Sequence, residues 1–128
     1  MEPLNLRDRE VPAVLAVVRL GTVTLEDAAL AKSVAECHER WGMWGFSVLE
    51  VPDGDYAALA RLRPIVATRR RLLVASGPAL VAAGFPLLAT LDHPHWTVVL
   101  SEPSTDQFER VRSLFEGPID DLAWTRSA

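Results

Sequence analysis

The segment DHPHWTVVL, residues 92–100, holds two of the three histidines of the chain directly before an apolar run. An imidazole transfers protons near neutral pH, and imidazole with carboxylate suits several divalent metal ions. In an extended strand alternate side chains share a face, so we expect His95 and Thr97 on one face and Trp96 and Val98 on the other. The segment therefore raises two hypotheses, phosphoester chemistry and a metal site.

Residues 95–98, HWTV, resemble one half-motif of the two-histidine phosphoesterases, whose pattern of His, hydrophobic, Ser or Thr, hydrophobic occurs twice. The resemblance implies that His95 acts as acid or base on a phosphodiester and that Thr97 holds its oxygens; His93 completes this alternative catalytic set. The second copy would need a histidine beside residues 46–48, where the chain has Gly45. One imidazole cannot be general acid and base at once, so this enzyme stays the alternative hypothesis.

A metal site would use Asp92, His93 and His95. Pro94 holds the residue before it extended, and no fourth ligand lies nearby in the sequence. His38 would have to approach through the fold. We therefore expect neither a metal nor a cofactor, and we interpret residues 92–95 as a polar turn that leads into a core strand.

Five arginines fall within eleven residues and form the best candidate binding cluster: Arg61, Arg63, Arg69, Arg70 and Arg71. Guanidinium groups suit bidentate recognition of phosphates and carboxylates. Trp44 is a further candidate contact, because tryptophan is enriched at binding hot spots. Cys37 and His38 do not form a thiol–base pair, since adjacent helical side chains point about 100° apart. Cys37 is expected to be a small buried residue.

Composition limits the class of protein. The chain has 128 residues, a net charge of −4 and 49% hydrophobic residues, which is typical of one globular domain and argues against nucleic acid as a partner. One cysteine excludes an internal disulfide, and no run reaches the roughly 20 apolar residues of a spanning helix. We therefore expect a soluble cytoplasmic protein. Lys32 is the single lysine among 13 basic residues, which resembles high-GC bacterial coding.

The first 41 residues are predicted to form a helical hairpin. Residues 11–20 fit a buried strand or a short helix, and Pro12 and Gly21 as helix boundaries favour the helix, although the β-branched content argues for a strand. Thr24 and Asp27 resemble a capping box that opens a helix over 25–41. Its apolar stripe consists of Leu30, Val34, Cys37 and Trp41.

The remainder is predicted to be a small sheet interleaved with helices. Strands are expected over 46–51, 71–75, 85–91 and 96–100, the last two as a hairpin. Helices are expected over 56–63 and, briefly, 79–83, and Ser104 opens another that Gly117-Pro118 closes. The prediction is a single α+β domain over 1–118, with an N-terminal helical hairpin, a three- or four-stranded sheet, and a tail over 119–128.

No complete catalytic set lies together in the sequence, so enzymatic activity is left open. The first hypothesis is an intracellular interaction or regulatory module, of toxin, antitoxin or immunity type, whose partner is another protein, an acidic one if the arginines make the contact. Self-association also stays open. The alternative is an enzyme that processes a phosphoester or nucleotide, with His95 and Thr97 at the substrate and the arginines as a phosphate clamp.

Overall fold

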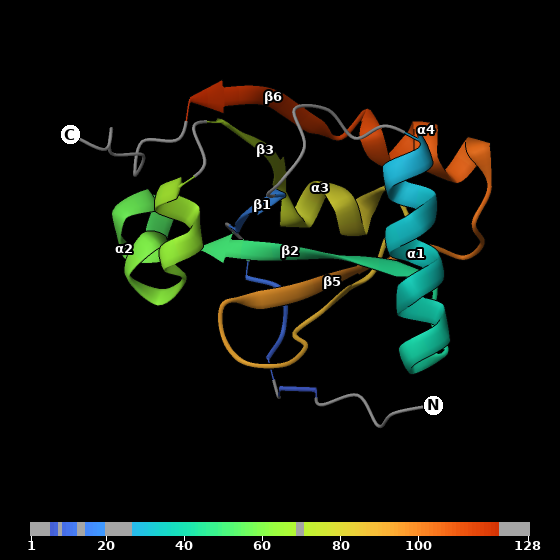
Figure 1. Cartoon of the computed structure of the whole chain (residues 1–128), viewed down its shortest axis with the longest axis horizontal. Helices are drawn as coiled ribbons and strands as arrows, with labels where there is room; N and C mark the ends of the chain where they lie inside the picture. The colour runs from blue at the N-terminus through green and yellow to red at the C-terminus, as the bar shows by residue number, and fades with distance from the viewer. Residues whose placement is uncertain (1–5, 8, 13–14, 20–26, 69–70, 121–128) are drawn as a thin grey trace.

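The computed structural model describes residues 6–7, 9–12, 15–19, 27–68 and 71–120, which form one six-stranded antiparallel sheet flanked by helices (Figure 1). The strand order is β4-β5-β2-β1-β3-β6. The strands are β1 (Ala16–Arg19), β2 (Gly45–Val51), β3 (Arg71–Ser76), β4 (Leu87–Leu88), β5 (His95–Val99) and β6 (Phe115–Asp120). The α-helices are α1 (Asp27–Trp41), α2 (Tyr56–Leu62), α3 (Gly77–Ala82) and α4 (Thr105–Arg112), with 3-10 turns η1 (Pro52–Gly54) and η2 (Pro64–Thr68).

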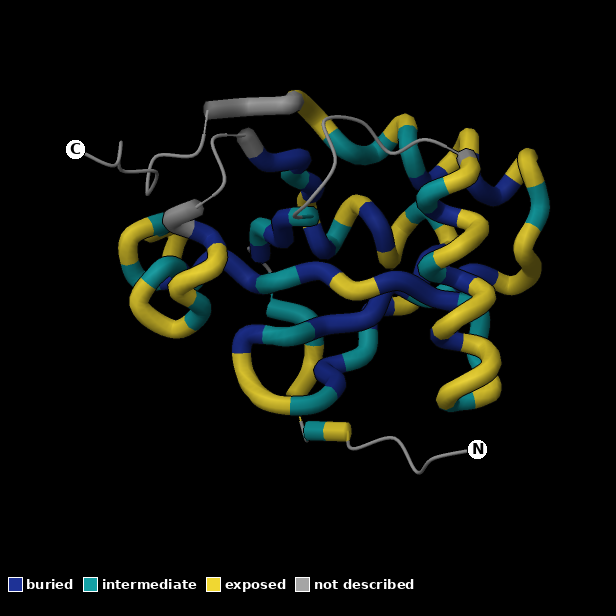
Figure 2. The backbone as a smooth tube through the Cα atoms, viewed as in Figure 1, coloured by how far each residue is buried: buried dark blue, intermediate teal, exposed yellow. Residues whose placement is uncertain are grey.

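The sheet buries both of its faces, because side chains alternate along each strand. Phe46 and Val48 of β2 belong to the larger apolar cluster, to which α1, α3 and α4 also contribute. Val51, at the end of the same strand, belongs to a smaller cluster with Leu59 of α2 and Val66 of η2. Figure 2 shows buried residues along β2 and β5 and exposed residues on the outer turns of α1 and α2.

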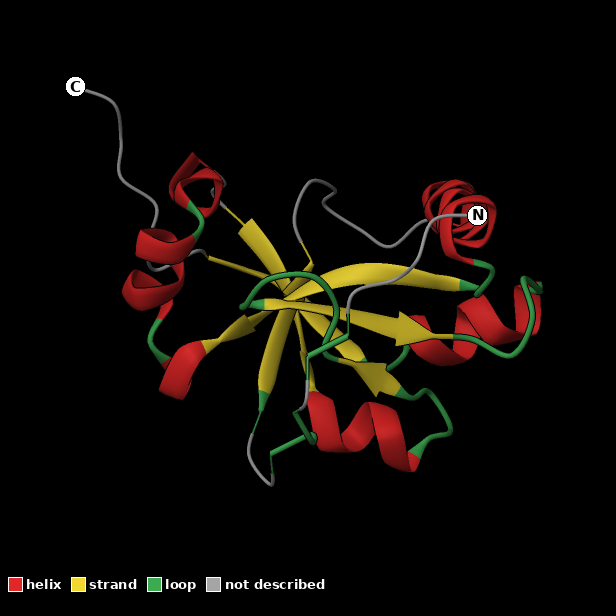
Figure 3. Ribbon diagram, turned by 90° about the horizontal axis from the view of Figure 1, so that it is seen from below, coloured by secondary structure: helices red, strands yellow, loops and turns green. Residues whose placement is uncertain are grey.

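The two ends of the molecule carry different helices. The sheet is strongly twisted, so its strands are splayed in the view of Figure 3. In Figure 1, β2 runs from the end that carries α1 and α4 to the end that carries α2. Strand β2 therefore links the end of the sheet near α1 and α4 to the end near α2.

The predicted N-terminal helical hairpin is wrong, because Ala16–Arg19 form strand β1 in the interior of the sheet. Val17 and Val18 are each 0% exposed and belong to different apolar clusters. A strand buried on both faces has a continuous apolar run, the same signal that a buried helix gives. The β-branched content was therefore the correct cue. Thr24 and Gly21, used as boundary signals, lie outside the described residues.

The predicted sheet of three or four strands is also wrong, since β1 and β6 bring the total to six. Helix α4 ends at Arg112, and Phe115–Asp120 pair with β3 at the edge of the sheet, where a helix end and the first residues of a tail were expected. The register shifts between Leu72 and Val74, opposite Gly117 at φ 117. A bulge on an edge strand accommodates Gly117-Pro118, so these residues did not terminate regular structure.

Several local predictions are confirmed. Helix α1 buries Leu30, Val34 and Cys37 of the predicted stripe, and Trp41 is half-buried. Helix α2 begins at Tyr56, as predicted, and the carboxylate of Asp55 caps it by accepting hydrogen bonds from the backbone N–H groups of Ala57 and Ala58 at 3.0 and 3.2 Å. Strands β4 and β5 pair as the expected hairpin. Among the described residues, no helix is long and apolar enough to cross a membrane. The protein is thus an α+β fold, as predicted, with a different topology.

Candidate functional site

His95 lies at the end of the sheet that adjoins α2. It begins β5 and is paired with Leu49, near the point where β2 leads into α2. The described N-terminal segment reaches the same place, since Leu6 forms a bridge with Thr90 and the backbone N–H of Arg7 donates to the carbonyl of Ala89 at 2.7 Å. Residues far apart in the sequence therefore meet around one imidazole.

Thr90 joins His95 to Thr97. Its Oγ1 lies 2.7 Å from His95 Nδ1 and 2.8 Å from Thr97 Oγ1. Thr90 and Thr97 are 0% and 1% exposed, so both hydroxyls are satisfied inside the protein. The hydrogen bond fixes the plane of the imidazole, and Thr97 acts on that imidazole through Thr90. The pattern around His95 did not point to Thr90.

Burial and the charges of two arginines favour the neutral form of the His95 imidazole. Its pKa is lowered mainly by burial and further by the charges of Arg7 and Arg63, against a hydrogen bond with the Thr90 backbone that raises it. Arg7 Nη2 also donates to the carbonyl of His95 at 2.8 Å. Burial is also the main cause that lowers the pKa of Arg7, whereas the charge of Asp92 raises that pKa. An imidazole whose neutral form is favoured, next to the guanidinium group of Arg7, is an arrangement that suits an anion.

Glu50 ties the N-terminal segment to the sheet. One of its oxygens accepts from Arg9 Nη2 and the other from the indole N–H of Trp96, each at 2.9 Å. Arg7 and Arg9 place their guanidinium carbons 5.9 and 5.7 Å from the centre of the Trp96 ring. Glu50 is 6% exposed and Trp96 is 0% exposed, so this is a buried, paired charge. No spacing in the sequence linked Glu50 to Arg9 or Trp96.

The arginine cluster divides in two. Arg61 lies in the last turn of α2 and Arg63 is the C-cap of that helix, whereas Arg69 and Arg70 lie outside the described residues and Arg71 begins β3. Leu62 and Ile65 lie close to Arg61 and Arg63 in the sequence, and their side chains are 42% and 49% exposed. We refer to Arg61, Leu62, Arg63 and Ile65 as the α2–η2 surface. This surface lies at the same end of the sheet as His95, and the charge of Arg63 is a minor cause that lowers the pKa of that imidazole.

The three histidines do not converge. His38 lies in the last turn of α1 and stacks on Trp44, with ring centres 3.7 Å apart, just before β2 begins. His95 lies near the opposite end of β2, and His93 is exposed in the turn before it. Within the described part of the chain, no three His, Cys, Asp or Glu side chains are close enough to hold a metal ion. Trp44 is half-buried by this stacking and is remote from the α2–η2 surface.

Gly45 explains why the second half of the phosphoesterase pattern is missing. A Cβ at this position would lie 2.8 Å from both the carbonyl oxygen of Val98 and the Cγ2 of Thr97. Backbone cannot move aside as a flexible side chain can, so a histidine does not fit here without moving β5. The close pairing of β2 with β5 thus leaves His95 as the single imidazole of this pattern.

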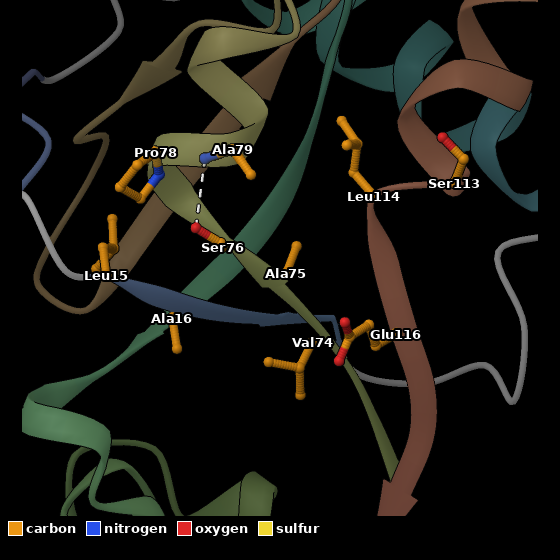
Figure 4. Close-up of a pocket in the computed structure, with 10 residues that line it drawn as sticks. All are labelled: Leu15, Ala16, Val74, Ala75, Ser76, Pro78, Ala79, Ser113, Leu114 and Glu116. Carbon is orange, nitrogen blue, oxygen red and sulfur yellow. Dashed lines mark hydrogen bonds between the residues drawn. The ribbon is translucent and has the colours of Figure 1, made fainter.

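Two hollows lie away from His95. A groove of about 700 Å³, shown in Figure 4, is bounded by β1, β3, α3 and the start of β6, and Ser76 caps α3 at its edge. A smaller pocket of about 330 Å³ lies between α1 and β2, and Arg19, Ser33, Cys37 and Trp41 are among its lining residues. No sequence pattern pointed to Arg19, the charged residue near the end of the apolar run 11–20.

Comparison with protein-family models, with curated proteins and with solved structures returns no match. The function of this chain is therefore inferred from the geometry of its own residues.

Proposed function

We propose that this chain is a small cytoplasmic interaction module of a bacterium, of toxin, antitoxin or immunity type, that binds an acidic protein through the α2–η2 surface. One observation carries the proposal: the exposed apolar side chains of Leu62 and Ile65 belong to the same short segment as Arg61 of α2 and its C-cap residue Arg63. Apolar anchors with arginine are typical of interface hot spots.

Charge is concentrated in this part of the chain. Residues 56–76 contain five arginines and no acidic residue, although the whole chain has a net charge of −4. Asp55 lies 4.0 Å from Arg61, but both side chains are exposed, at 54% and 72%, so the pair contributes little. Arg61 can therefore exchange that contact for a carboxylate of a partner. Such complementarity mainly speeds association and sets specificity.

The test uses immobilised polyglutamate as the acidic probe. Binding is expected to weaken steeply with salt, and the double substitution Arg61→Glu with Arg63→Glu should weaken it at least about tenfold, since two attractive charges become repulsive. Arg110→Glu with Arg112→Glu is the matched control, because these arginines have the same spacing in the last turn of α4. Equal losses in both double variants would reject the α2–η2 surface as the binding site.

Recovery of native partners distinguishes specific binding by this module from nonspecific attraction to a basic surface. Cross-linked partners recovered from cells should disappear for Leu62→Ser with Ile65→Ser while circular dichroism remains unchanged. Partners recovered equally by this variant would exclude an apolar contact at the α2–η2 surface.

A second candidate function is phosphoester chemistry at His95. The hydrogen bond between Thr90 and Nδ1 supports it, because an oriented imidazole whose neutral form is favoured is suited to general base catalysis. Arg7 and Arg63 would hold the phosphate, and Thr97 would position the imidazole through Thr90. His93, exposed in the adjacent turn, would be the other proton carrier.

Hydrolysis of bis(p-nitrophenyl) phosphate tests this candidate. His95→Gln should abolish any hydrolysis with folding retained, whereas His38→Gln, at the other end of β2, should not change it. A selective loss of this kind would rule out a pure interaction module. If the wild type shows no hydrolysis above the His95→Gln background, phosphodiester hydrolysis at His95 is excluded.

A further inference from the structure

Arg19 is the half-buried cation at the opposite end of β2 from His95. Its Nη1 donates to the carbonyl of Ser47 at 2.7 Å and its Nη2 to the hydroxyl of Ser33 at 2.8 Å. The guanidinium carbon lies 5.5 Å from the centre of the Phe46 ring. These contacts hold the side chain in one orientation between α1 and β2.

Arg19 is held by neutral groups. Both of these acceptors are uncharged oxygens, and among the described residues no Asp or Glu forms an ion pair with it. Burial lowers the pKa of its guanidinium, which means that the cation is destabilised where it lies. Charges withdrawn from water are normally paired, because the lost hydration must be replaced by an opposite charge. A guanidinium has five N–H donors, so two hydrogen bonds leave capacity for a third partner.

The adjoining pocket has room for such a partner. It encloses about 330 Å³ and is also lined by Cys37, Arg40, Trp41 and Gly45. Burial raises the pKa of the Cys37 thiol, which favours its neutral form. Glu36 lines the pocket too, but it is exposed and stands four residues before Arg40, a spacing at which opposite charges on a helix attract.

We propose that the pocket between α1 and β2 binds a small oxoanion, a phosphate or carboxylate group, on the guanidinium of Arg19. Ser33 and Ser47 orient the guanidinium, and the ring of Phe46 supports its face. The anion replaces the missing counter-charge. This site is separate from the α2–η2 surface, so it can be tested independently of the proposed function.

The test is calorimetric titration of the full chain with inorganic phosphate and, separately, with acetate. Saturable binding of one or both is expected, and the tighter anion identifies the phosphate or the carboxylate as the preferred group. Ser33→Asp would place an internal carboxylate beside Arg19 Nη2, which in the wild type donates to the Ser33 hydroxyl at 2.8 Å. Ser33→Asp should therefore weaken anion binding at least about tenfold. Ser33→Asn introduces an uncharged side chain of the same shape as aspartate, so it should retain anion binding.

A second pair of variants checks the cation itself. Arg19→Gln should abolish binding, and Arg110→Gln is its control, because Arg110 also bonds a backbone carbonyl and lies over an aromatic ring. If Arg19→Gln fails to fold, the Ser33 pair decides alone. No saturable binding of either anion, or equal losses for Ser33→Asp and Ser33→Asn, would overturn the proposal.

Discussion

Arg9 and Arg19 both pack beside an aromatic ring of the sheet, one near each end of β2, and they differ in what balances their charge. Arg9 pairs with Glu50, which is itself held by the Trp96 indole. Arg19 bonds a hydroxyl and a carbonyl, and among the described residues no carboxylate pairs with it. The comparison distinguishes two roles of an arginine side chain. An arginine paired with a carboxylate stabilises the fold, whereas an arginine held by neutral groups can bind a ligand.

Removal of Glu50 should have the largest effect. Glu50→Ala leaves Arg9 and the buried Trp96 N–H without an acceptor, so the free energy of unfolding should fall by about 3 kcal/mol. Urea denaturation monitored by circular dichroism measures the change. Ser33→Ala is the equivalent deletion beside Arg19 and should cost about 1 kcal/mol. Equal costs at both ends would contradict the difference between the two arginines.

Removal of the two cations gives the next largest difference. Arg9→Met leaves the carboxylate of Glu50 buried and half-satisfied, with an expected loss of about 2 kcal/mol. Arg19→Met removes a destabilised cation and keeps apolar contact with Phe46, so its loss should be below about 1 kcal/mol. Urea midpoints in phosphate-free buffer test the ranking. The predicted ranking is contradicted if Arg19→Met lowers the free energy of unfolding more than Arg9→Met does.

Thr90→Val tests the hydrogen-bond network at the His95 end. The substitution keeps the shape of the side chain but removes the hydroxyl that bonds both His95 and Thr97, which should cost about 1.5 kcal/mol because two buried polar groups lose a partner. Thermal unfolding measures the loss. Thr105→Val, at the exposed start of α4, is the control and should be close to neutral. A neutral Thr90→Val would mean that this network does not hold the imidazole.

The smallest expected effect is a pH dependence of stability from His95. Because its folded pKa is lowered, the unfolded chain binds the proton more readily once the pH falls below the ordinary value of 6.5. Its contribution to stability is therefore complete above that pH and declines as the pH falls toward the folded pKa. Unfolding of wild type and His95→Asn between pH 7.5 and about 5 should differ in slope. Identical slopes would show that His95 titrates alike in both states.

Local signals in the sequence predicted much of the secondary structure. The apolar stripe of α1, the start of α2 and the apolar segments of β2 and β5 can be recognised from residues close together in the sequence, and each was predicted near its observed place. The Ser104 cap of α4 was also predicted, and its hydroxyl accepts from the N–H of Gln107 at 3.2 Å. The Ser104 cap is closed by a hydrogen bond between residues three positions apart, so the local sequence specifies it.

The candidate sites were less predictable, because their members are far apart in the chain. Glu50 meets Arg9 across 41 positions and Trp96 across 46, and Arg7 meets His95 across 88. No spacing rule links such residues. The histidines show the reverse case: His93 and His95 are close in sequence, yet only His95 is held in a network within the described residues.

By itself, the sequence determined a mixed α+β protein with one clear amphipathic helix, capped short helices and a basic segment at 61–71. Tertiary structure decided that residues 16–19 form a strand, since an apolar run is compatible with helix or strand until β2 and β3 pair with it on both sides. It also decided which charges are paired, because pairing depends on distances that only the folded sheet fixes. For the same reason Arg9 meets a carboxylate while Arg19 faces a pocket.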